Sequence, residues 1–263
     1  RPQEQHEPFG PYPGFGRFAR YAQYSGAIPQ ISLVMGTVSG ATCYAAALSD
    51  VVFMVKGTSH MFMGDPAEVK QQTGDEVSEE ELGGARLHAT ISGVADVLAE
   101  NDADCMRKCK DLLSYLPSNS WELPPVVDTG DDPNRRDDTL ADVLPPSRLR
   151  AYSMYNVITR IVDNGQFFEI KAGWAKNLIT CLARLNGRTV GILANNPMVL
   201  AGAMTPDSSD KGSRFIRLCD AYNIPVINLM DTPAYLVGTK MEYAGIIRHG
   251  SKMLYAHSEV TVP

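Results

Sequence analysis

The sequence predicts an α/β protein, and three observations support this fold class. Short apolar runs typical of buried strands, such as Val51–Val55, alternate along the chain with segments of helical apolar spacing. Helix-capping patterns separate several of these segments. The pair Asn186-Gly187 stands between two apolar runs, which is a strong hairpin signal. The chain has 263 residues, 44 % of them apolar and 21 % charged, as in ordinary globular proteins.

The first predicted elements are two buried strands with a small-residue segment between them. We expect a helix over Phe15 to Gly26 and then a buried strand from Ile28 to Met35. Gly36 to Asp50 follows as a tight turn that opens into an alanine-rich helix. Val51 to Val55 forms the second buried strand, which is short, wholly apolar and rich in valine.

Capping patterns predict the next helices. Asp65 precedes Pro66 and stands three residues before Glu68, and Gly74 supplies a stop. Ser78 repeats the pattern three residues before an acidic residue. Asp102 to Leu116 is predicted as a helix with one apolar stripe, formed by Cys105, Cys109, Leu112, Leu113 and Leu116.

Leu123 to Ser147 is rich in Pro and Asp, which is typical of a linker. The elements expected after it are a helix capped by Ser153 and ending near Asp163, a hairpin of Leu178–Leu185 with Thr189–Ala194, a helix over Ser208–Tyr222, a strand over Val226–Met230, a helix over Met241–His257 and a strand beginning at Val260. The predicted organisation is therefore residues 1–122, a linker 123–150, and residues 151–263.

A short repeat spans the linker. Ile28 to Leu33 reads I-P-Q-I-S-L, and Ile224 to Leu229 reads I-P-V-I-N-L. Two domains of one fold would explain this similarity, and a chance match is the alternative.

Composition excludes several function classes. The formal net charge of 24 − 30 = −6 argues against sequence-independent nucleic-acid binding. No apolar run reaches the ~20 residues of a membrane span. The five cysteines include no C-x-x-C pair, and the histidines show no metal-ligand spacing, so we predict no metal site and a reducing, cytoplasmic compartment.

Gly36 to Asp50 is the segment best suited to chemistry. A strand runs through a small-residue turn into a helix, whose first N–H groups lack intrahelical partners and lie at its positive end. The N–H groups of Gly40 and Ala41 could stabilise a developing oxyanion. The alternative is a plain turn that uses small residues for packing. Asp231, which follows a predicted strand, is either a site residue or a turn cap.

Several long motifs resemble one family. They are T-G-D-E-V-S-E-E-E-L-G-G-A (Thr73 to Ala85), F-E-I-K-A-G-W-A-K-N (Phe168 to Asn177), R-T-V-G-I-L-A-N-N-P (Arg188 to Pro197) and G-T-K-M-E-Y-A-G-I-I-R-H-G-S-K-M-L-Y-A (Gly238 to Ala256). In this order they are similar to motifs of the carboxyltransferase (beta) subunits of biotin-dependent acyl-CoA carboxylases, with the propionyl/acetyl-CoA carboxylase branch closest.

The resemblance implies two repeated crotonase-like domains, each only partly present here. It places acyl-CoA on the first domain and biotin, carried by a separate biotinylated subunit, on the second. The implied reaction transfers a carboxyl group from carboxybiotin to the α-carbon of a short acyl-CoA. The implied assembly is a homo-oligomer whose active site is shared between two subunits.

The resemblance also implies site residues. The family's A-G-G, which forms its first oxyanion hole, matches Ser39-Gly40-Ala41, so Gly40 and Ala41 are the predicted catalytic residues. Gly36, Ser39 and Tyr44 are expected near the acyl-CoA and Gly238 at the facing site, with packing or a turn as the alternative roles. Ala41 stands where the family has a glycine, so the resemblance does not identify which acyl chain the protein prefers.

Other functions remain open from sequence alone. One is the decarboxylase subunit of a biotin-dependent sodium pump, which runs the same sites in the opposite direction. Others are a crotonase-like hydratase or thioester hydrolase without biotin, and a non-catalytic scaffold paralogue. In the family, the second oxyanion hole comes shortly after a strand that begins with Val-Pro, like Val262-Pro263. Residues 1–263 do not include that second hole, so we expect them to be inactive alone.

Overall fold

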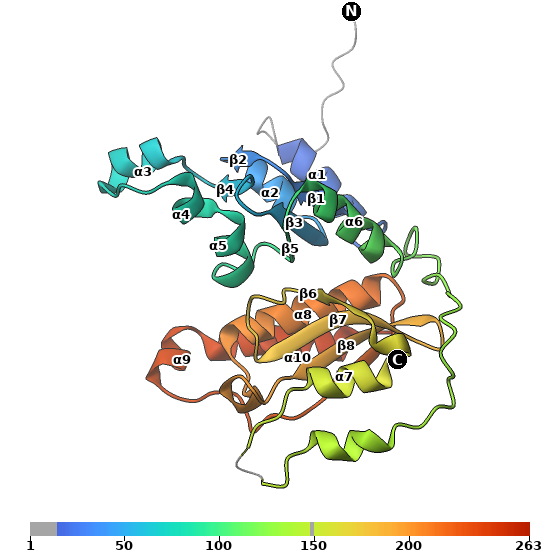
Figure 1. The fold of residues 1–263 in the computed structure, drawn as a ribbon. Coiled ribbons are helices and arrows are strands. Elements are labelled where there is room, and N and C mark those ends of the chain that lie inside the picture. Colours follow the sequence, from blue (N-terminus) through green and yellow to red (C-terminus); the bar gives the residue numbers. More distant parts are fainter. Residues whose placement is uncertain (1–14, 148–149) are drawn as a thin grey trace, which may run out of the picture.

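The computed structural model describes residues 15–147 and 150–263, which form two α/β halves joined by an extended connection (Figure 1). We refer to residues 15–122 as the N-terminal half and to residues 151–263 as the C-terminal half. Strands and helices alternate through most of the chain. The predicted α/β class is thus confirmed.

The N-terminal half is built on parallel strands. Its main sheet has the order β1-β3-β5, and β2 pairs with β4 separately. All five residues of β3 are buried, as its uninterrupted apolar sequence predicts. The strands are β1 (Ile31–Val34), β2 (Thr37–Ser39), β3 (Val51–Val55), β4 (His60–Phe62) and β5 (Val97–Ala99).

Local capping fixes the helices of this half. Asp65 and Ser78 each form a capping box, and Gly74 ends α3 with a φ of 82°, as predicted. The expected stripe on α6 is wrong at Leu113, which is 49 % exposed, whereas Leu112 is buried. The helices are α1 (Phe15–Tyr24), α2 (Thr42–Ala47), α3 (Pro66–Thr73), α4 (Glu79–Gly83), α5 (Ala85–Thr90) and α6 (Asp102–Leu113).

The C-terminal half contains one four-stranded sheet in the order β6-β7-β8-β9. Its β7–β8 hairpin turns at Asn186 and Gly187, with φ values of 52° and 72°, which confirms the predicted two-residue turn. The pair β8–β9 is parallel. The strands are β6 (Phe167–Ile170), β7 (Leu178–Leu185), β8 (Arg188–Asn195) and β9 (Val226–Leu229).

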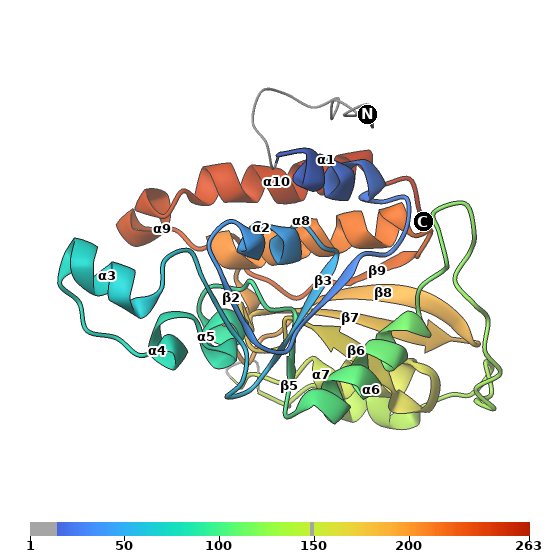
Figure 2. The same ribbon diagram turned by 90° about the horizontal axis from the view of Figure 1, so that it is seen from above.

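Helices cover both faces of this sheet, with α8 and α10 side by side on one face and α7 on the other (Figure 2). They are α7 (Tyr155–Ile161), α8 (Pro206–Ala221), α9 (Thr239–Tyr243) and α10 (Ile246–Glu259), with short 3-10 turns η1 (Asp138–Val143), η2 (Asp163–Gly165) and η3 (Leu200–Gly202).

Three expectations for the C-terminal half are wrong in detail. Ser153 does not cap α7, because the N-cap position falls on Met154. The single helix expected from Met241 is broken before α10, where Gly245 has a φ of 78°. No strand forms from Val260, although the Pro263 carbonyl accepts a hydrogen bond of 2.8 Å from the first N–H of β9.

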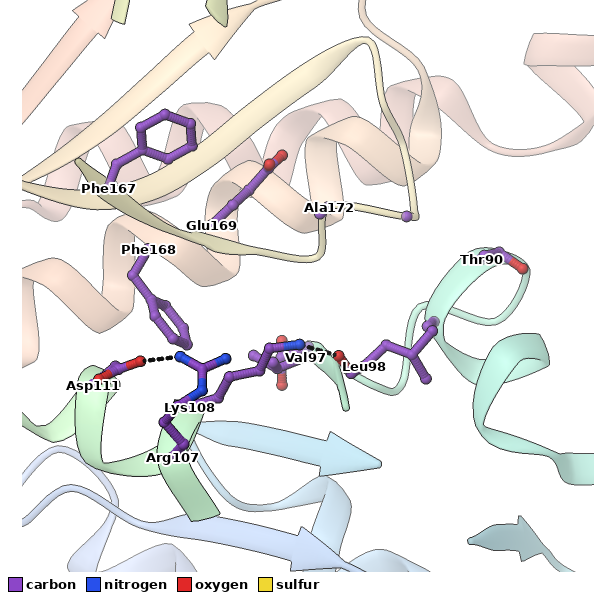
Figure 3. Close-up of a pocket in the computed structure, with 13 residues that line it drawn as sticks. Thr90, Val97, Leu98, Arg107, Lys108, Asp111, Phe167, Phe168, Glu169 and Ala172 are labelled. Atoms are coloured by element: carbon purple, nitrogen blue, oxygen red, sulfur yellow. Dashed lines mark hydrogen bonds and ion pairs between the residues drawn. The ribbon is translucent and has the colours of Figure 1, made fainter. Parts of the chain in front are cut away.

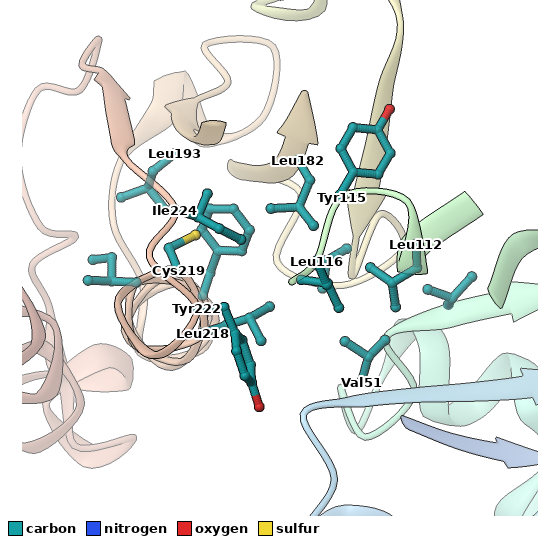
Figure 4. Packing of buried hydrophobic residues seen from close by; sticks show 14 of the residues in the cluster. Val51, Leu112, Tyr115, Leu116, Leu182, Leu193, Leu218, Cys219, Tyr222 and Ile224 are labelled. Carbon is teal, nitrogen blue, oxygen red and sulfur yellow. The ribbon is translucent and has the colours of Figure 1, made fainter. Parts of the chain in front are cut away.

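The two halves share one hydrophobic core (Figure 4). Val51 and Leu112 of the N-terminal half lie in the same buried cluster as Leu182 and Tyr222 of the C-terminal half. The hydroxyl of Tyr222 also donates to the Asp50 carboxylate at 2.6 Å. The predicted boundaries therefore divide the chain into two halves that pack against each other through a common core.

Polar groups reinforce this contact. The Lys171 ammonium pairs with the Asp96 carboxylate at 2.9 Å, and both side chains are buried. The Lys171 N–H donates to the Asp96 carbonyl at 2.8 Å. Trp174 packs on Gly93 so closely that a Cβ there would lie 2.5 Å from the indole ring. A glycine is therefore required at position 93.

Candidate active site

The predicted turn is held by a short parallel ladder. Strand β2 pairs with β4, and Ser39 lies opposite Phe62. Sequence reasoning missed β2, which lies inside the predicted turn. The Gly40 N–H continues the ladder by donating to the Phe62 carbonyl at 3.0 Å. Gly40 has a φ of 62°, which a glycine adopts without steric cost.

This geometry bears on the role expected for Gly40. Its N–H is already bonded within the sheet, so it is not a free oxyanion donor in this structure. Ala41 takes the N-cap position of α2, and α2 starts at Thr42. Within residues 15–147 and 150–263, neither the Ala41 N–H nor the Thr42 N–H has a hydrogen-bond acceptor. Both residues are exposed, so the unpaired donors belong to the solvent-accessible side of the turn.

A buried thiol hydrogen-bonds to both strands beside the turn. Cys43 Sγ donates to the carbonyls of Val38 and Phe62, each at 3.3 Å. Burial raises the pKa of the Cys43 thiol, which keeps it protonated as a donor. The side chain therefore ties the end of β2, the end of β4 and the first turn of α2 together.

The other predicted substrate residues take different positions around the turn. Gly36 precedes β2, Ser39 is its last residue, and both are exposed. Tyr44 is 53 % exposed, and its ring meets Phe18 of α1 edge-on at 6.4 Å between centroids. Its contact with α1 agrees with the packing alternative, while its exposed edge remains available.

Gly238 lies in the C-terminal half and is not in hydrogen-bonding contact with this turn. It is the N-cap of α9, with a φ of 127° that favours glycine, and its carbonyl accepts from the N–H of Met241. Asp231 follows β9, and its carboxylate accepts a 2.6 Å hydrogen bond from the Tyr152 hydroxyl. Burial and this carboxylate raise the pKa of Tyr152 to about 12.

A cavity of about 450 Å³, which the sequence did not predict, lies between α6 and β6 (Figure 3). Phe168 points toward α6, where Lys108 donates to the Leu98 carbonyl at 2.8 Å and Arg107 pairs with Asp111. Lys108 and Arg107 therefore already have partners. The cavity combines an apolar wall with charges that are already paired.

The turn can stabilise negative charge on an oxygen, because unpaired N–H groups lie at the positive end of α2. Within the described ranges no cluster of three His, Cys, Asp or Glu side chains is arranged to hold a metal ion. The described helices also include none that is long and apolar enough to cross a membrane.

The fold defines the class: a crotonase-like α/β protein. The chain belongs to the carboxyl transferase domain family, whose model matches residues 4–263. This membership confirms the family and the crotonase-like fold that the sequence motifs imply.

Named relatives agree with this assignment. The chain is 51 % identical over 251 residues to the methylmalonyl-CoA decarboxylase subunit alpha of Veillonella parvula, covering 95 % of this chain and 49 % of that protein. It is 48 % identical over 246 residues to the human mitochondrial propionyl-CoA carboxylase beta chain, covering 94 % and 46 %.

Solved structures agree as well. The transcarboxylase 12S structure with methylmalonyl-coenzyme A bound, described as a hexamer assembly, superposes with a TM-score of 0.92 at 43 % identity, covering 95 % of this chain and 48 % of that one. The chain therefore spans about half the length of the curated relatives it matches.

Proposed function

We propose that this chain takes part in moving a carboxyl group between biotin and the α-carbon of a short acyl-CoA. The observation that carries the proposal is the carboxyl transferase family match over residues 4–263. The relatives named for propionyl-CoA and methylmalonyl-CoA support a short acyl chain. Biotin is expected on a partner subunit, and self-association is expected from the relative described as a hexamer.

In the proposed reaction the α-proton of the acyl thioester leaves, and negative charge develops on the thioester oxygen as the enolate forms. The α-carbon then attacks the carboxyl carbon of carboxybiotin, the bond from that carbon to the biotin nitrogen breaks, and this nitrogen ends with the proton. We assign stabilisation of the thioester oxygen to the Ala41 N–H together with the Thr42 N–H, since both are unpaired and exposed at the start of α2. Gly40 sets the turn through its positive φ.

Gly36, Ser39 and Tyr44 are proposed to line the acyl-CoA side, because they lie on or beside the same exposed turn. Gly238 is proposed for the biotin side, at the open start of α9. Neither assignment requires a metal ion.

The reverse direction is a second candidate function. The relative at 51 % identity is named a methylmalonyl-CoA decarboxylase subunit, whereas the human relative at 48 % is a propionyl-CoA carboxylase chain. Both reactions use the same oxyanion donors, because carboxylation and decarboxylation pass through the same enolate.

The complete subunit that contains these residues provides the test. It is incubated with a carboxylated biotin carrier and propionyl-CoA, and separately with methylmalonyl-CoA and the uncarboxylated carrier, and labelled carboxyl groups are followed. Transfer in either direction supports the proposal, and the faster direction identifies the function. Hydration or hydrolysis of the thioester without any carboxyl donor, with no transfer, contradicts it.

A further inference from the structure

A second cavity, with a polar lining, lies where the N-terminal half meets α8. Its volume is about 300 Å³, and its walls come from the end of α1, the end of α2 and one face of α8. The chemically important residues are Ser25, Asp50, Arg214 and Arg217. We call it the seam pocket. The predicted carboxyl transfer site does not include it, because that site is at the opposite end of α2.

The two arginines of the seam pocket lack carboxylate partners. They lie one helical turn apart on α8 and are both exposed. Within the described residues neither guanidinium lies in an ion pair, whereas Arg107, Arg135 and Arg160 each have at least one.

Both guanidinium groups retain donors. Arg214 uses Nη2 for the backbone carbonyls of Ser49 and Asp50, at 2.5 and 3.5 Å. Arg217 lies over the Tyr255 ring at 5.5 Å from its centroid, and within the described residues its N–H groups donate no hydrogen bond. The pocket thus combines anchored cations with unused N–H groups.

Among the residues that the structure describes, Asp50 is the one acid that lines this pocket. One oxygen of its carboxylate already accepts from the Gln30 N–H at 2.8 Å and from the Tyr222 hydroxyl at 2.6 Å. The carboxylate is held by these two donors and forms no ion pair with Arg214 among the described residues. Two cations therefore face one anion, with which Arg214 interacts electrostatically, and the pocket keeps an excess of one positive charge.

We propose that the seam pocket is a binding site for a phosphate-class oxyanion, with room for a phosphate or a diphosphate. Guanidinium forks match the oxygen spacing of phosphate and bind it through paired charge-assisted hydrogen bonds. The exposed hydroxyl of Ser25 provides an additional donor at the rim. The source is either a free oxyanion or the diphosphate of a larger coenzyme, and the inference does not depend on the proposed carboxyl transfer.

Titration calorimetry with inorganic pyrophosphate tests the site. We expect saturable binding, weakened about tenfold or more in Arg217→Gln, since a charge-assisted hydrogen bond contributes about 1.5–3 kcal/mol. Arg188→Gln is the matched control, because it makes the same charge change on an exposed residue at the start of β8. Melting temperatures check that each variant folds, and Arg214→Gln repeats the test on the second cation.

Absence of saturable binding, or equal weakening in Arg217→Gln and Arg188→Gln, overturns the proposal. Coenzyme A then distinguishes the source: competition with pyrophosphate assigns the site to a phosphorylated coenzyme, and independent binding assigns it to a free oxyanion. Both results support the site. Because binding is the readout, a failure of carboxyl transfer is distinguishable from a failure of this inference.

Discussion

Gly40 connects the sequence of the turn to its geometry. Its φ of 62° lies in the left-handed region, whereas Gly36 adopts no such conformation, and a Cβ at either position meets no close neighbour. Gly40→Ala is expected to lower the free energy of unfolding by about 1–2 kcal/mol through backbone strain alone. Gly36→Ala is the control, with an expected change near zero. Urea denaturation measures both, and equal effects would contradict this role.

Lys211 is a buried cation whose ammonium donates to the carbonyls of Lys171 and Trp174, each at 2.9 Å. Burial lowers the pKa of Lys211 from 10.5 to about 7. Between these values the unfolded chain binds more protons than the folded one. The free energy of unfolding therefore rises with pH, by at most ~1.4 kcal/mol per pH unit.

We expect this rise between pH 7 and 8.5, measured by urea denaturation. Lys211→Met removes the titrating group and flattens the slope. Lys110→Met, on the exposed face of α6, keeps it. A slope that is unchanged in Lys211→Met contradicts the assignment.

At the residue scale, sequence reasoning located the turn and the Ala41 donor, but it named the Gly40 N–H as the second donor, whereas the second unpaired N–H is that of Thr42. Gly36 to Ala41 could be found from small-residue spacing and from the family motif. That the Gly40 N–H is taken by Phe62 depends on a strand pairing across 22 positions, which no local pattern encodes.

The β7–β8 hairpin depends on one acid from outside its strands. The buried Asp163 carboxylate accepts from the N–H groups of Asn186 and Gly187, at 2.9 and 2.7 Å, and from the Thr129 hydroxyl at 2.9 Å. Asp163→Ala is expected to lower the free energy of unfolding by about 2–3 kcal/mol, because these donors lose their acceptor. Asp132→Ala, an exposed acid in the connection, should change it by less than about 0.5 kcal/mol. Comparable losses would show that Asp163 has no special role.

Elements with local signals were predicted well. Strand β3 and helix α3 follow from an apolar run and a capping box, and both match their predicted bounds closely. Strand β2 was missed because it has three residues and exists only by pairing with β4. The break before α10 was missed because a glycine inside a helical pattern is ordinarily tolerated, whereas Gly245 here adopts a positive φ.

At the scale of the whole molecule, the shared core predicts cooperative unfolding. Trp174 belongs to the C-terminal half but packs on Gly93 of the N-terminal half. In a Trp121→Phe background, in which Trp174 is the remaining tryptophan, its fluorescence and the far-UV circular dichroism should report one coincident transition in urea. Tyr222→Phe, which removes the hydroxyl bond to Asp50, should lower the midpoint without splitting the transition. Two separate transitions would mean that the halves unfold independently.

The central claim is that the start of α2 stabilises the thioester oxygen during carboxyl transfer, and Ala41 allows a direct measurement. Its φ of −59° suits proline, so Ala41→Pro removes the unpaired N–H and no hydrogen bond of the fold, while Ala41→Gly keeps the donor. In the complete subunit, kcat for carboxyl transfer should fall about 10²–10³-fold in Ala41→Pro and stay near wild type in Ala41→Gly, with both variants folded. An unchanged kcat in Ala41→Pro would contradict the claim.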